Sequence, residues 1–286
     1  MTTEVLRYAA FTVDGRGGNP AGVVLDARGL DASQMQAIAA DLGFSETAFL
    51  VARPDEPNVY DVRYFAPKQE VPFCGHATIA AAVALVERSP ADELIFHAPA
   101  GFVSITTCRN ANGEIVAEMT SVSPRTTQPD PGLVAAALSA LRWSADDLDP
   151  SYPVLLANAG SEHLIFVTKT RRRLANLDYD FDALAKLMRK HGLVTLQLIW
   201  PESKKRYYSR NPFAGSGVVE DPATGAAAAA FGAYLRELGM ISENAAFTII
   251  QGVDMGRPSK LEVSVIGGEP GVHVTGAAHS IDEVTS

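Results

Sequence analysis

Cysteine is nearly absent from this chain: Cys74 and Cys108 are the only two among 286 residues. Two cysteines form at most one disulfide, which is too few to hold together a chain of this length. The scarcity excludes the class of small secreted domains stabilised by disulfides. We therefore expect two free thiols in a protein of a reducing compartment.

Positive charge and long apolar runs are also scarce. The chain has 24 Lys and Arg against 33 Asp and Glu, which gives a net charge of −9. Nucleic-acid binding needs a clustered basic face, so we expect no nucleic-acid partner and interpret the basic run Arg171–Arg173 as a solvated turn or helix edge. The longest small-apolar run, 225–235, is shorter than the roughly 20 residues that span a bilayer. The first residues do not resemble a secretory signal. We expect a cytoplasmic protein with no membrane partner.

Sequence motifs for metals and nucleotides are missing as well. The sequence has no HExxH, no paired CxxC and no P-loop, and the glycine-rich stretch at 15–20 is not a dinucleotide fingerprint. The histidines other than His76 are scattered without metal-ligand spacing. The sequence therefore predicts no metal site.

What the chain does contain is an internal repeat. The pattern E-x-P-x-x-G occurs at 70–75 and again at 220–225, and each copy leads into an alanine-rich segment. Before each copy lie a predicted helix, 31–44 or 180–193, and a predicted strand–turn–strand, 47–65 or 195–213. We predict two halves, 1–125 and 130–286, joined by a proline-rich linker at 123–132, with the option that the last strand returns to the first half.

The alanine-rich segments determine the predicted fold. A helix that is small and apolar on all sides is buried all round. We therefore predict an α+β fold of two pseudo-repeated lobes, each a twisted, mostly antiparallel, barrel-like sheet around a central alanine-rich helix. The repeated motifs stand at the N-termini of these helices, so we expect both N-termini to face an active-site cleft between the lobes.

The two helix starts carry different side chains. A helix N-terminus offers backbone N–H groups and a positive dipole end, which together suit a small anion such as a carboxylate. Glu46 is a third candidate, because a carboxylate between a helix end and an apolar strand is placed for proton transfer. The residues at the helix starts are Cys74, Gly75 and His76 in the first copy and Asp221, Thr224, Gly225 and Ala226 in the second.

Each candidate taken alone is also compatible with a structural role. His76 can be a polar residue in a first helical turn, Cys74 a small buried apolar residue, Asp221 a helix N-cap and Glu46 a surface carboxylate. The functional interpretation depends on their joint occurrence on the repeated frame.

Five segments together resemble the phenazine-biosynthesis isomerase (PhzF-like) family, which has the diaminopimelate epimerase-like fold. They are FTVDGRGGNPAGVV (11–24), SETAF (45–49), RYFAPKQEVPFCGHAT (63–78), EDPATG (220–225) and QGVDMGRPS (251–259). The resemblance implies proton-transfer chemistry in the cleft, no cofactor and a homodimer.

The same resemblance assigns roles to residues. It implies a catalytic Glu46, substrate binding by His76 with Gly75 and by Asp221, and a secondary role for Asn19 of the first segment. The family serine that follows T-G is Ala226 in this sequence, which counts against the phenazine precursor as the substrate.

The racemases of that fold use two cysteines. Here Cys74 stands at the place of the first cysteine and Thr224 at the place of the second. A threonine hydroxyl is too weak a base to replace a thiolate, so two-thiol racemisation is set aside.

Three hypotheses about function follow. The first is a cofactor-independent isomerase that moves a proton on a small carboxylate-bearing metabolite, with Glu46 as general acid and base and the helix starts holding the substrate. The second is a lyase or dehydratase that uses a Cys74 thiolate. The third is a non-catalytic small-molecule-binding relative.

Overall fold

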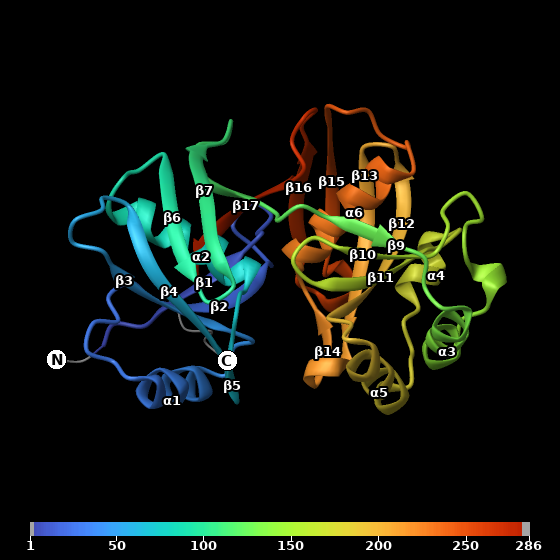
Figure 1. The fold of residues 1–286 in the computed structure, drawn as a ribbon, viewed down its shortest axis with the longest axis horizontal. Coiled ribbons are helices and arrows are strands. Elements are labelled where there is room, and N and C mark those ends of the chain that lie inside the picture. The colour runs from blue at the N-terminus through green and yellow to red at the C-terminus, as the bar shows by residue number, and fades with distance from the viewer. Residues whose placement is uncertain (1–2, 282–286) are drawn as a thin grey trace. The chain divides into compact units, whose positions relative to one another are not determined.

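The computed structural model describes residues 3–281 and shows a mixed α/β fold (Figure 1). The chain divides into two compact units: unit 1 comprises residues 1–120 and 275–286, and unit 2 comprises residues 121–274. None of the helices within residues 3–281 combines the length and hydropathy that crossing a lipid bilayer requires.

Unit 1 is a closed barrel around a helix. Within its described residues, eight strands pair in the circular order β1–β2–β3–β4–β6–β7–β8–β17, and β17 closes the circle by pairing with both β8 and β1. The β2–β3 and β4–β6 pairs are parallel. The elements are β1 (Leu6–Ala10), β2 (Asn19–Val24), α1 (Ala32–Leu42), β3 (Thr47–Ala52), β4 (Val59–Ala66), β5 (Gln69–Val71), α2 (Gly75–Arg88), β6 (Glu93–Ala98), β7 (Gly101–Arg109), β8 (Ile115–Thr120) and β17 (Val272–Ser280).

The alanine-rich sequence of α2 explains its place in the barrel. Every residue from His76 to Leu85 is buried, and the helix contacts strands on opposite sides of the circle, β2 opposite β7 and β3 opposite β8 (Figure 1). Small side chains allow this close approach on all faces of the helix. The prediction of a buried central helix is confirmed for α2.

Unit 2 repeats the same order of pairings. Here β10–β11, β12–β13 and β15–β16 are antiparallel, whereas β11–β12 and β13–β15 are parallel, as in the corresponding pairs of unit 1. Its central helix, α6, is buried from Ala227 to Leu235. The elements are β9 (Arg125–Thr127), α3 (Pro131–Leu141), β10 (Leu155–Asn158), β11 (Glu162–Val167), α4 (Arg171–Ala175), α5 (Phe181–His191), β12 (Thr195–Ser203), β13 (Arg206–Phe213), β14 (Val218–Asp221), α6 (Gly225–Glu237), β15 (Ala245–Gln251) and β16 (Ser259–Val265).

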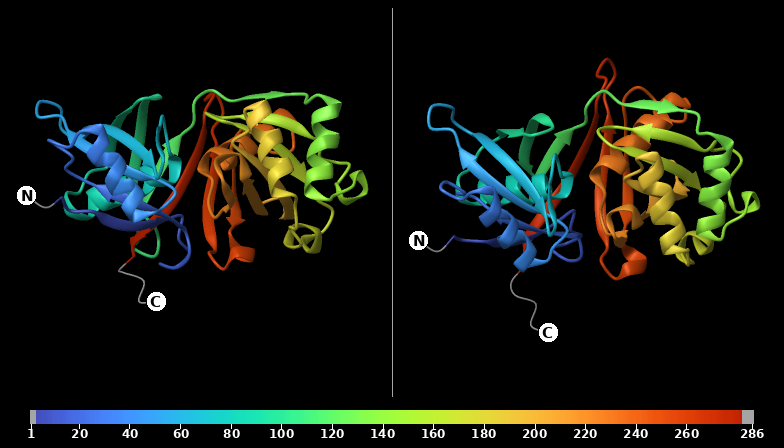
Figure 2. Two further views of the ribbon diagram at one scale, coloured as in Figure 1. Left: turned by 90° about the horizontal axis from the view of Figure 1, so that it is seen from below. Right: turned by 60° about the horizontal axis from the view of Figure 1, so that its bottom comes forward.

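The predicted linker at 123–132 is wrong in its details. It contains β9, which pairs with β10, and the first residues of α3. Asp130 caps α3 by accepting hydrogen bonds from the N–H groups of Gly132 and Leu133, and Pro131 occupies its first turn. Proline and aspartate indicate a turn, but in this order they also start a helix. In Figure 2, α3 and α5 lie side by side, and both pack on β11 and β12 through a shared apolar cluster.

A buried histidine in the sheet of unit 2 gives a testable pH dependence. The ring of His163 is fully buried between the hydroxyls of Ser161 and Thr195, at 3.0 and 2.8 Å. Burial lowers the pKa of His163 from 6.5 to about 3. The unfolded chain therefore takes up a proton below about pH 6.5 that the folded chain does not, so stability is lost as the pH falls from about 6.5 toward 3.

We expect this one group to contribute a slope of about 1.4 kcal/mol per pH unit in that window. The variant His163→Gln should lack that part of the slope. The slope is measured from the free energy of unfolding in urea at several pH values. The control is His191→Asn, which changes an exposed residue of α5. An unchanged slope in His163→Gln would contradict the assignment.

Candidate active site

The start of α2 brings together two predicted site residues, Glu46 and His76. Glu46 directly precedes β3, and its carbonyl accepts a hydrogen bond from the Gly22 N–H at 3.1 Å. His76 is the second residue of α2, and its Nε2 lies 3.4 Å from Glu46 Oε2. The two side chains are only 7% (His76) and 13% (Glu46) exposed. A carboxylate and an imidazole at this separation can act together in proton transfer, since such contacts commonly shorten when a substrate binds.

Cys74 and Ser45 complete this group. Cys74 is the N-cap residue of α2, and its Sγ lies 3.4 Å from His76 Nδ1. Ser45 Oγ lies 3.2 Å from His76 Nε2. Ser45 was missed by the sequence analysis, where its only signal was its place in the SETAF segment. One donor atom each from Glu46, Cys74 and His76 lie within 4.8 Å of one another, which is close enough for the three to hold a metal ion.

Hydrogen bonds behind the helix start fix its first turn. Thr78 Oγ1 lies 2.8 Å from the Cys74 carbonyl, to which it donates, and 2.6 Å from the Tyr64 hydroxyl. Burial raises the pKa of Tyr64 above its ordinary value, so this hydroxyl remains protonated. The positions of Cys74 and His76 are therefore set by a buried network rather than by exposed side chains.

Gly75 and Asn19 differ in how their surroundings constrain them. A Cβ atom on Gly75 would come no closer than 3.4 Å to the rest of the protein, at Met119 Cε, so internal packing does not require glycine at this position. Asn19 is the first residue of β2, opposite Ala10, and is 2% exposed.

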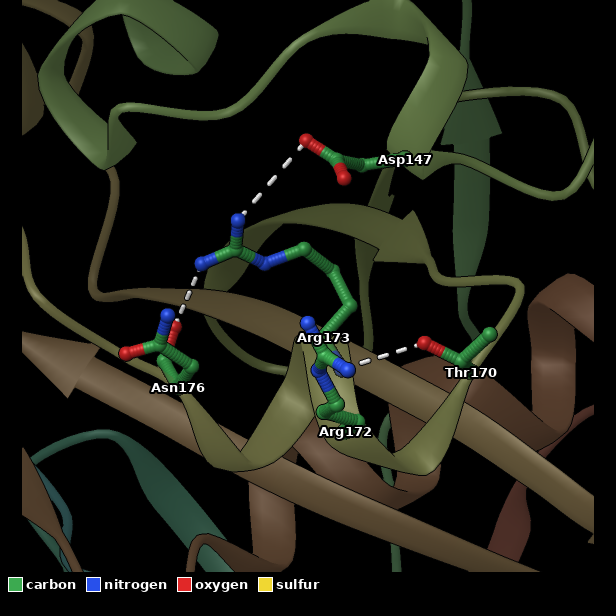
Figure 3. Close-up of a pocket in the computed structure, with 5 residues that line it drawn as sticks. All are labelled: Asp147, Thr170, Arg172, Arg173 and Asn176. Carbon is green, nitrogen blue, oxygen red and sulfur yellow. Dashed lines mark hydrogen bonds and ion pairs between the residues drawn. The ribbon is translucent and has the colours of Figure 1, made fainter.

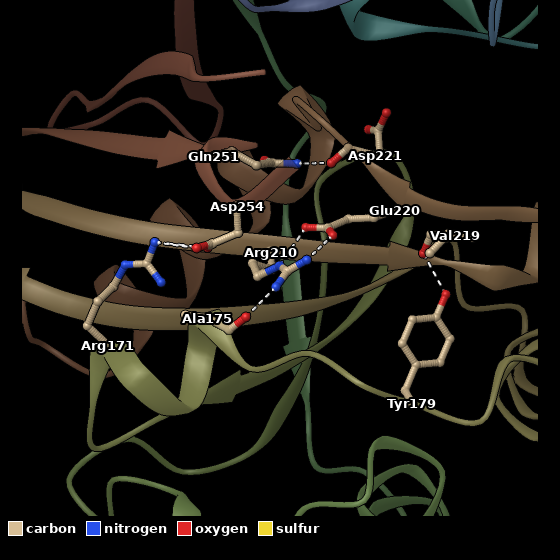
Figure 4. A network of polar contacts seen from close by, with 9 residues as sticks. All are labelled: Arg171, Ala175, Tyr179, Arg210, Val219, Glu220, Asp221, Gln251 and Asp254. Atoms are coloured by element: carbon tan, nitrogen blue, oxygen red, sulfur yellow. Dashed lines mark hydrogen bonds and ion pairs between the residues drawn. The ribbon is translucent and has the colours of Figure 1, made fainter. Parts of the chain in front are cut away.

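In unit 2, the start of α6 holds a second polar cluster. Thr224, not Asp221, is the N-cap residue of α6, so the alternative of Asp221 as N-cap is wrong. Gln251 Nε2 donates to the Asp221 carbonyl at 2.7 Å (Figure 4). Thr224 Oγ1 donates to Asp221 Oδ2 at 2.5 Å and lies 3.1 Å from Gln251 Nε2. Gly225 and Ala226 are the first residues of α6, the one buried and the other half-buried. The cluster orders Asp221 and Thr224 with respect to each other.

Gln251 was not predicted, although it begins the QGVDMGRPS segment. The residue after Gln251 is Gly252, and its close backbone contacts require glycine at this position. Gly252 has φ +74°, and a Cβ at this position would lie 2.2 Å from the Arg257 carbonyl oxygen and 2.8 Å from that of Pro222. Only glycine allows this approach, which keeps Gln251 beside the loop that follows Asp221.

An ion pair immediately precedes Asp221. Arg210 Nε and Nη2 donate to the Glu220 carboxylate at 2.9 and 2.5 Å, and Nη1 donates to the Ala175 carbonyl at 2.8 Å (Figure 4). Burial alone would lower the pKa of Arg210, but the hydrogen bonds and charge of Glu220 raise it above its ordinary value. At the corresponding position of unit 1, Arg63 forms the same two-point contact with Glu70. The repeated glutamate of E-x-P-x-x-G is therefore an ion-pair partner in both units.

A separate pocket in unit 2, of about 350 Å³, contains none of the predicted site residues (Figure 3). Of its two arginines, Arg173 has protein partners: Nη2 donates to the Asn176 carbonyl, and the guanidinium packs over the Trp143 ring. Arg171 pairs with Asp254 and packs over Tyr208. The three arginines begin the short helix α4, so the expected turn or helix edge is a helix. Arg172 is exposed, whereas Arg171 and Arg173 are half-buried and paired. The pocket is lined by Asp147, Thr170, Arg172, Arg173 and Asn176.

Comparisons with known proteins agree on one family. Residues 8–283 match the family model described as phenazine biosynthesis-like protein (PhzC-PhzF). An uncharacterized isomerase of Bacillus subtilis is 31% identical, over 96% of this chain and 95% of its own. The trans-2,3-dihydro-3-hydroxyanthranilate isomerase of Pseudomonas chlororaphis is 32% identical, over 85% of this chain and 83% of its own.

Solved structures extend this agreement to the fold. A PhzF-family phenazine biosynthesis protein of Bacillus anthracis superposes with a TM-score of 0.88 at 27% identity, covering 99% of this chain and 98% of its own. A probable proline racemase of Agrobacterium radiobacter, at 15% identity, shares the fold with a TM-score of 0.66 over 98% of this chain and 91% of its own. The chain therefore belongs to the phenazine biosynthesis-like protein family and is one of its isomerases.

Proposed function

We propose that the protein moves a proton between two carbon atoms of a small carboxylate-bearing substrate without a cofactor, and that Glu46 carries the proton. The observation that carries this proposal is the contact between the Glu46 carboxylate and the His76 ring at 3.4 Å, with both side chains nearly buried. The Glu46 carboxylate takes the proton as the C–H bond breaks, and the electron pair is delocalised into the substrate. Glu46 then returns the proton to the second carbon, so the reaction leaves no net charge or proton behind.

The residues around Glu46 have binding and orienting roles in this mechanism. His76 and Ser45 orient the carboxylate, because Nε2 of the ring is within 3.4 Å of the Glu46 oxygen and 3.2 Å of the Ser45 hydroxyl. The N-terminus of α2 is a site for the substrate's carboxylate, since helix N-termini favour anions by about 0.3–2 kcal/mol. Packing does not require Gly75, which is consistent with a glycine kept for close approach of a ligand.

We propose in addition that the two units are pseudo-repeated lobes of a diaminopimelate epimerase-like fold and that the start of α6, like that of α2, binds a polar group of a substrate. The matching order of strand pairings in the two units supports the first part. The ordered Asp221–Thr224–Gln251 cluster at the start of α6 supports the second, because it holds a carboxylate and a hydroxyl beside a helix N-terminus.

The name of the Pseudomonas chlororaphis relative indicates the substrate class: a cyclic amino acid whose carboxylate is close to the reacting carbons. We propose a substrate of this class but not that compound itself, because Ala226 removes a hydroxyl that the family motif offers at the start of α6.

Incubation with a panel of small cyclic amino and hydroxy acids in D₂O tests the proposal. We expect one compound to take up deuterium and to give a product of the same mass apart from deuterium, followed by NMR and mass spectrometry. A product lighter by one water would identify a dehydratase instead, and binding without exchange would identify a non-catalytic relative.

Once this compound is known, the variant Asp221→Asn tests whether the start of α6 binds substrate. If it does, KM should rise at least about tenfold, since a lost hydrogen bond to a charged group is worth about 1.5–3 kcal/mol. An unchanged KM would exclude that role.

A further inference from the structure

The three side chains at the start of α2 are of kinds that bind metal ions as well as move protons. Glu46 contributes an oxygen, Cys74 a sulfur and His76 a nitrogen, and one such atom from each lie within 4.8 Å of one another. All three are buried or nearly so, and they come from two elements, the residue before β3 and the first turn of α2. Buried charged groups are either paired with one another or coordinate a metal ion.

Two of the three separations between these atoms are close to those of a tetrahedral zinc site. Bonds of about 2.0–2.3 Å at a tetrahedral angle place neighbouring ligand atoms about 3.3–3.6 Å apart. His76 Nε2 lies 3.4 Å from Glu46 Oε2 and 3.8 Å from Cys74 Sγ. A small side-chain rotation is therefore enough to bring all three atoms into the coordination sphere of one ion.

The types of atom select the metal. Magnesium and calcium prefer oxygen ligands in larger number, whereas a mixture of thiolate, imidazole and carboxylate suits zinc. Three protein ligands leave the fourth position for water or for an anion, as in open zinc sites. Thr78 donates a buried hydrogen bond to the Cys74 carbonyl and accepts one from the Tyr64 hydroxyl, which holds the first turn of α2 in place. Two of the three ligands are therefore preorganised.

We propose that Glu46, Cys74 and His76 bind Zn²⁺ reversibly and that the bound ion inhibits the isomerase. On binding, the Cys74 thiol releases its proton to solvent and the ion is coordinated by Sγ, Nε2 and a Glu46 oxygen. The Glu46 carboxylate is then unable to accept a proton from carbon. The inhibitory part rests on the proposed function, whereas the binding part does not.

Metal binding is tested directly with Co²⁺ as a spectroscopic probe, on the full chain after treatment with a chelator. We expect one equivalent of Co²⁺ to produce a thiolate-to-metal absorption band that Zn²⁺ abolishes by displacement. The variants Cys74→Ser, His76→Gln and Glu46→Gln should each weaken binding more than about 100-fold, because loss of a direct ligand exceeds the 10–100-fold effect of second-shell changes. The matched control is Cys108→Ser, which removes the only other cysteine, an exposed one, and should leave the band unchanged.

Two results would overturn the proposal: a wild-type protein without the band, or a band that survives Cys74→Ser and disappears in Cys108→Ser. Far-UV circular dichroism confirms that each variant is folded, and Zn²⁺ should raise the Tm of the wild type but not of Cys74→Ser. Once a substrate is known, Zn²⁺ should lower kcat and a chelator should restore it. Zn²⁺ binding without inhibition would reject the inhibitory part of the proposal alone. Because Zn²⁺ binding is measured without turnover, a failure of the isomerase proposal is distinguishable from a failure of metal binding.

Discussion

Glu46→Gln should lower kcat about 10²–10⁴-fold, the range that a single general acid–base group contributes. The amide keeps the size of the carboxyl group and can still hydrogen-bond to His76, 3.4 Å from it in the wild type. It has no basic oxygen that takes up a proton from carbon, so the deuterium exchange on the substrate should fall by the same factor as turnover. KM should change much less, because in the proposed mechanism backbone groups of α2 bind the substrate's carboxylate.

The matched control is Glu93→Gln, which makes the same chemical change at an exposed position of β6 in the same unit. It should have wild-type kcat. Circular dichroism and Tm show whether Glu46→Gln is folded. A folded Glu46→Gln that retains turnover and exchange would remove Glu46 from the mechanism, and the proton carrier would then have to be sought in His76 or Cys74.

Glu220→Gln should destabilise the protein by about 3–5 kcal/mol, the typical loss when one partner of a buried ion pair is removed. The side chains of Arg210 and Glu220 are only 11% and 4% exposed. Without the carboxylate, the Arg210 guanidinium remains buried with a full charge and with the Ala175 carbonyl, at 2.8 Å, as an uncharged partner. Urea unfolding of the variant measures this loss.

The protein contains its own control for this experiment. Arg63 and Glu70 make the same contact in unit 1, at 2.7 Å for both hydrogen bonds, but their side chains are 38% and 35% exposed. Hydrogen bonding to Arg63 lowers the pKa of Glu70, yet solvent screens an exposed pair. Glu70→Gln should therefore lose less than about 1 kcal/mol. Equal losses in the two variants would show that burial does not determine the strength of this contact.

Much of the fold was predictable because its signals are local. Gly43 and Gly192 end α1 and α5 in the left-handed conformation that glycine favours, at φ 69° and 66°, as the sequence indicated. The alanine-rich segments predicted both central helices, because a helix that is small and apolar on all sides is buried on all sides. The start of α3 was missed because Asp130 and Pro131 carry the same signals as a turn.

The candidate site was predictable only in part, for a physical reason. Glu46 and His76 stood out by residue type and motif, but their contact depends on where β3 starts beside α2 in the barrel. The same is true of Ser45 and Gln251, whose roles rest on hydrogen bonds to residues far away in the sequence. The spacing of residues in the sequence did not predict the metal-binding arrangement either, since Glu46 lies far from Cys74 and His76 along the chain. Side chains that meet through tertiary structure leave no periodic signal.

The closing strand of the unit 1 barrel has a consequence for the order of folding. β17 joins β8 to β1 through pairs such as Tyr8 with Ser280 and through a hydrogen bond from Thr275 to Glu118, so residues near both ends of the sequence complete one barrel. During synthesis on the ribosome, β1 through β8 emerge first. The free edges of β1 and β8 then lack their β17 partner until residues 121–274 have been synthesised. Contacts of such long sequence separation form slowly. Unit 2 is contiguous and needs no such delay, so the barrel that holds Glu46 and His76 becomes complete only after the residues of unit 2 have been synthesised.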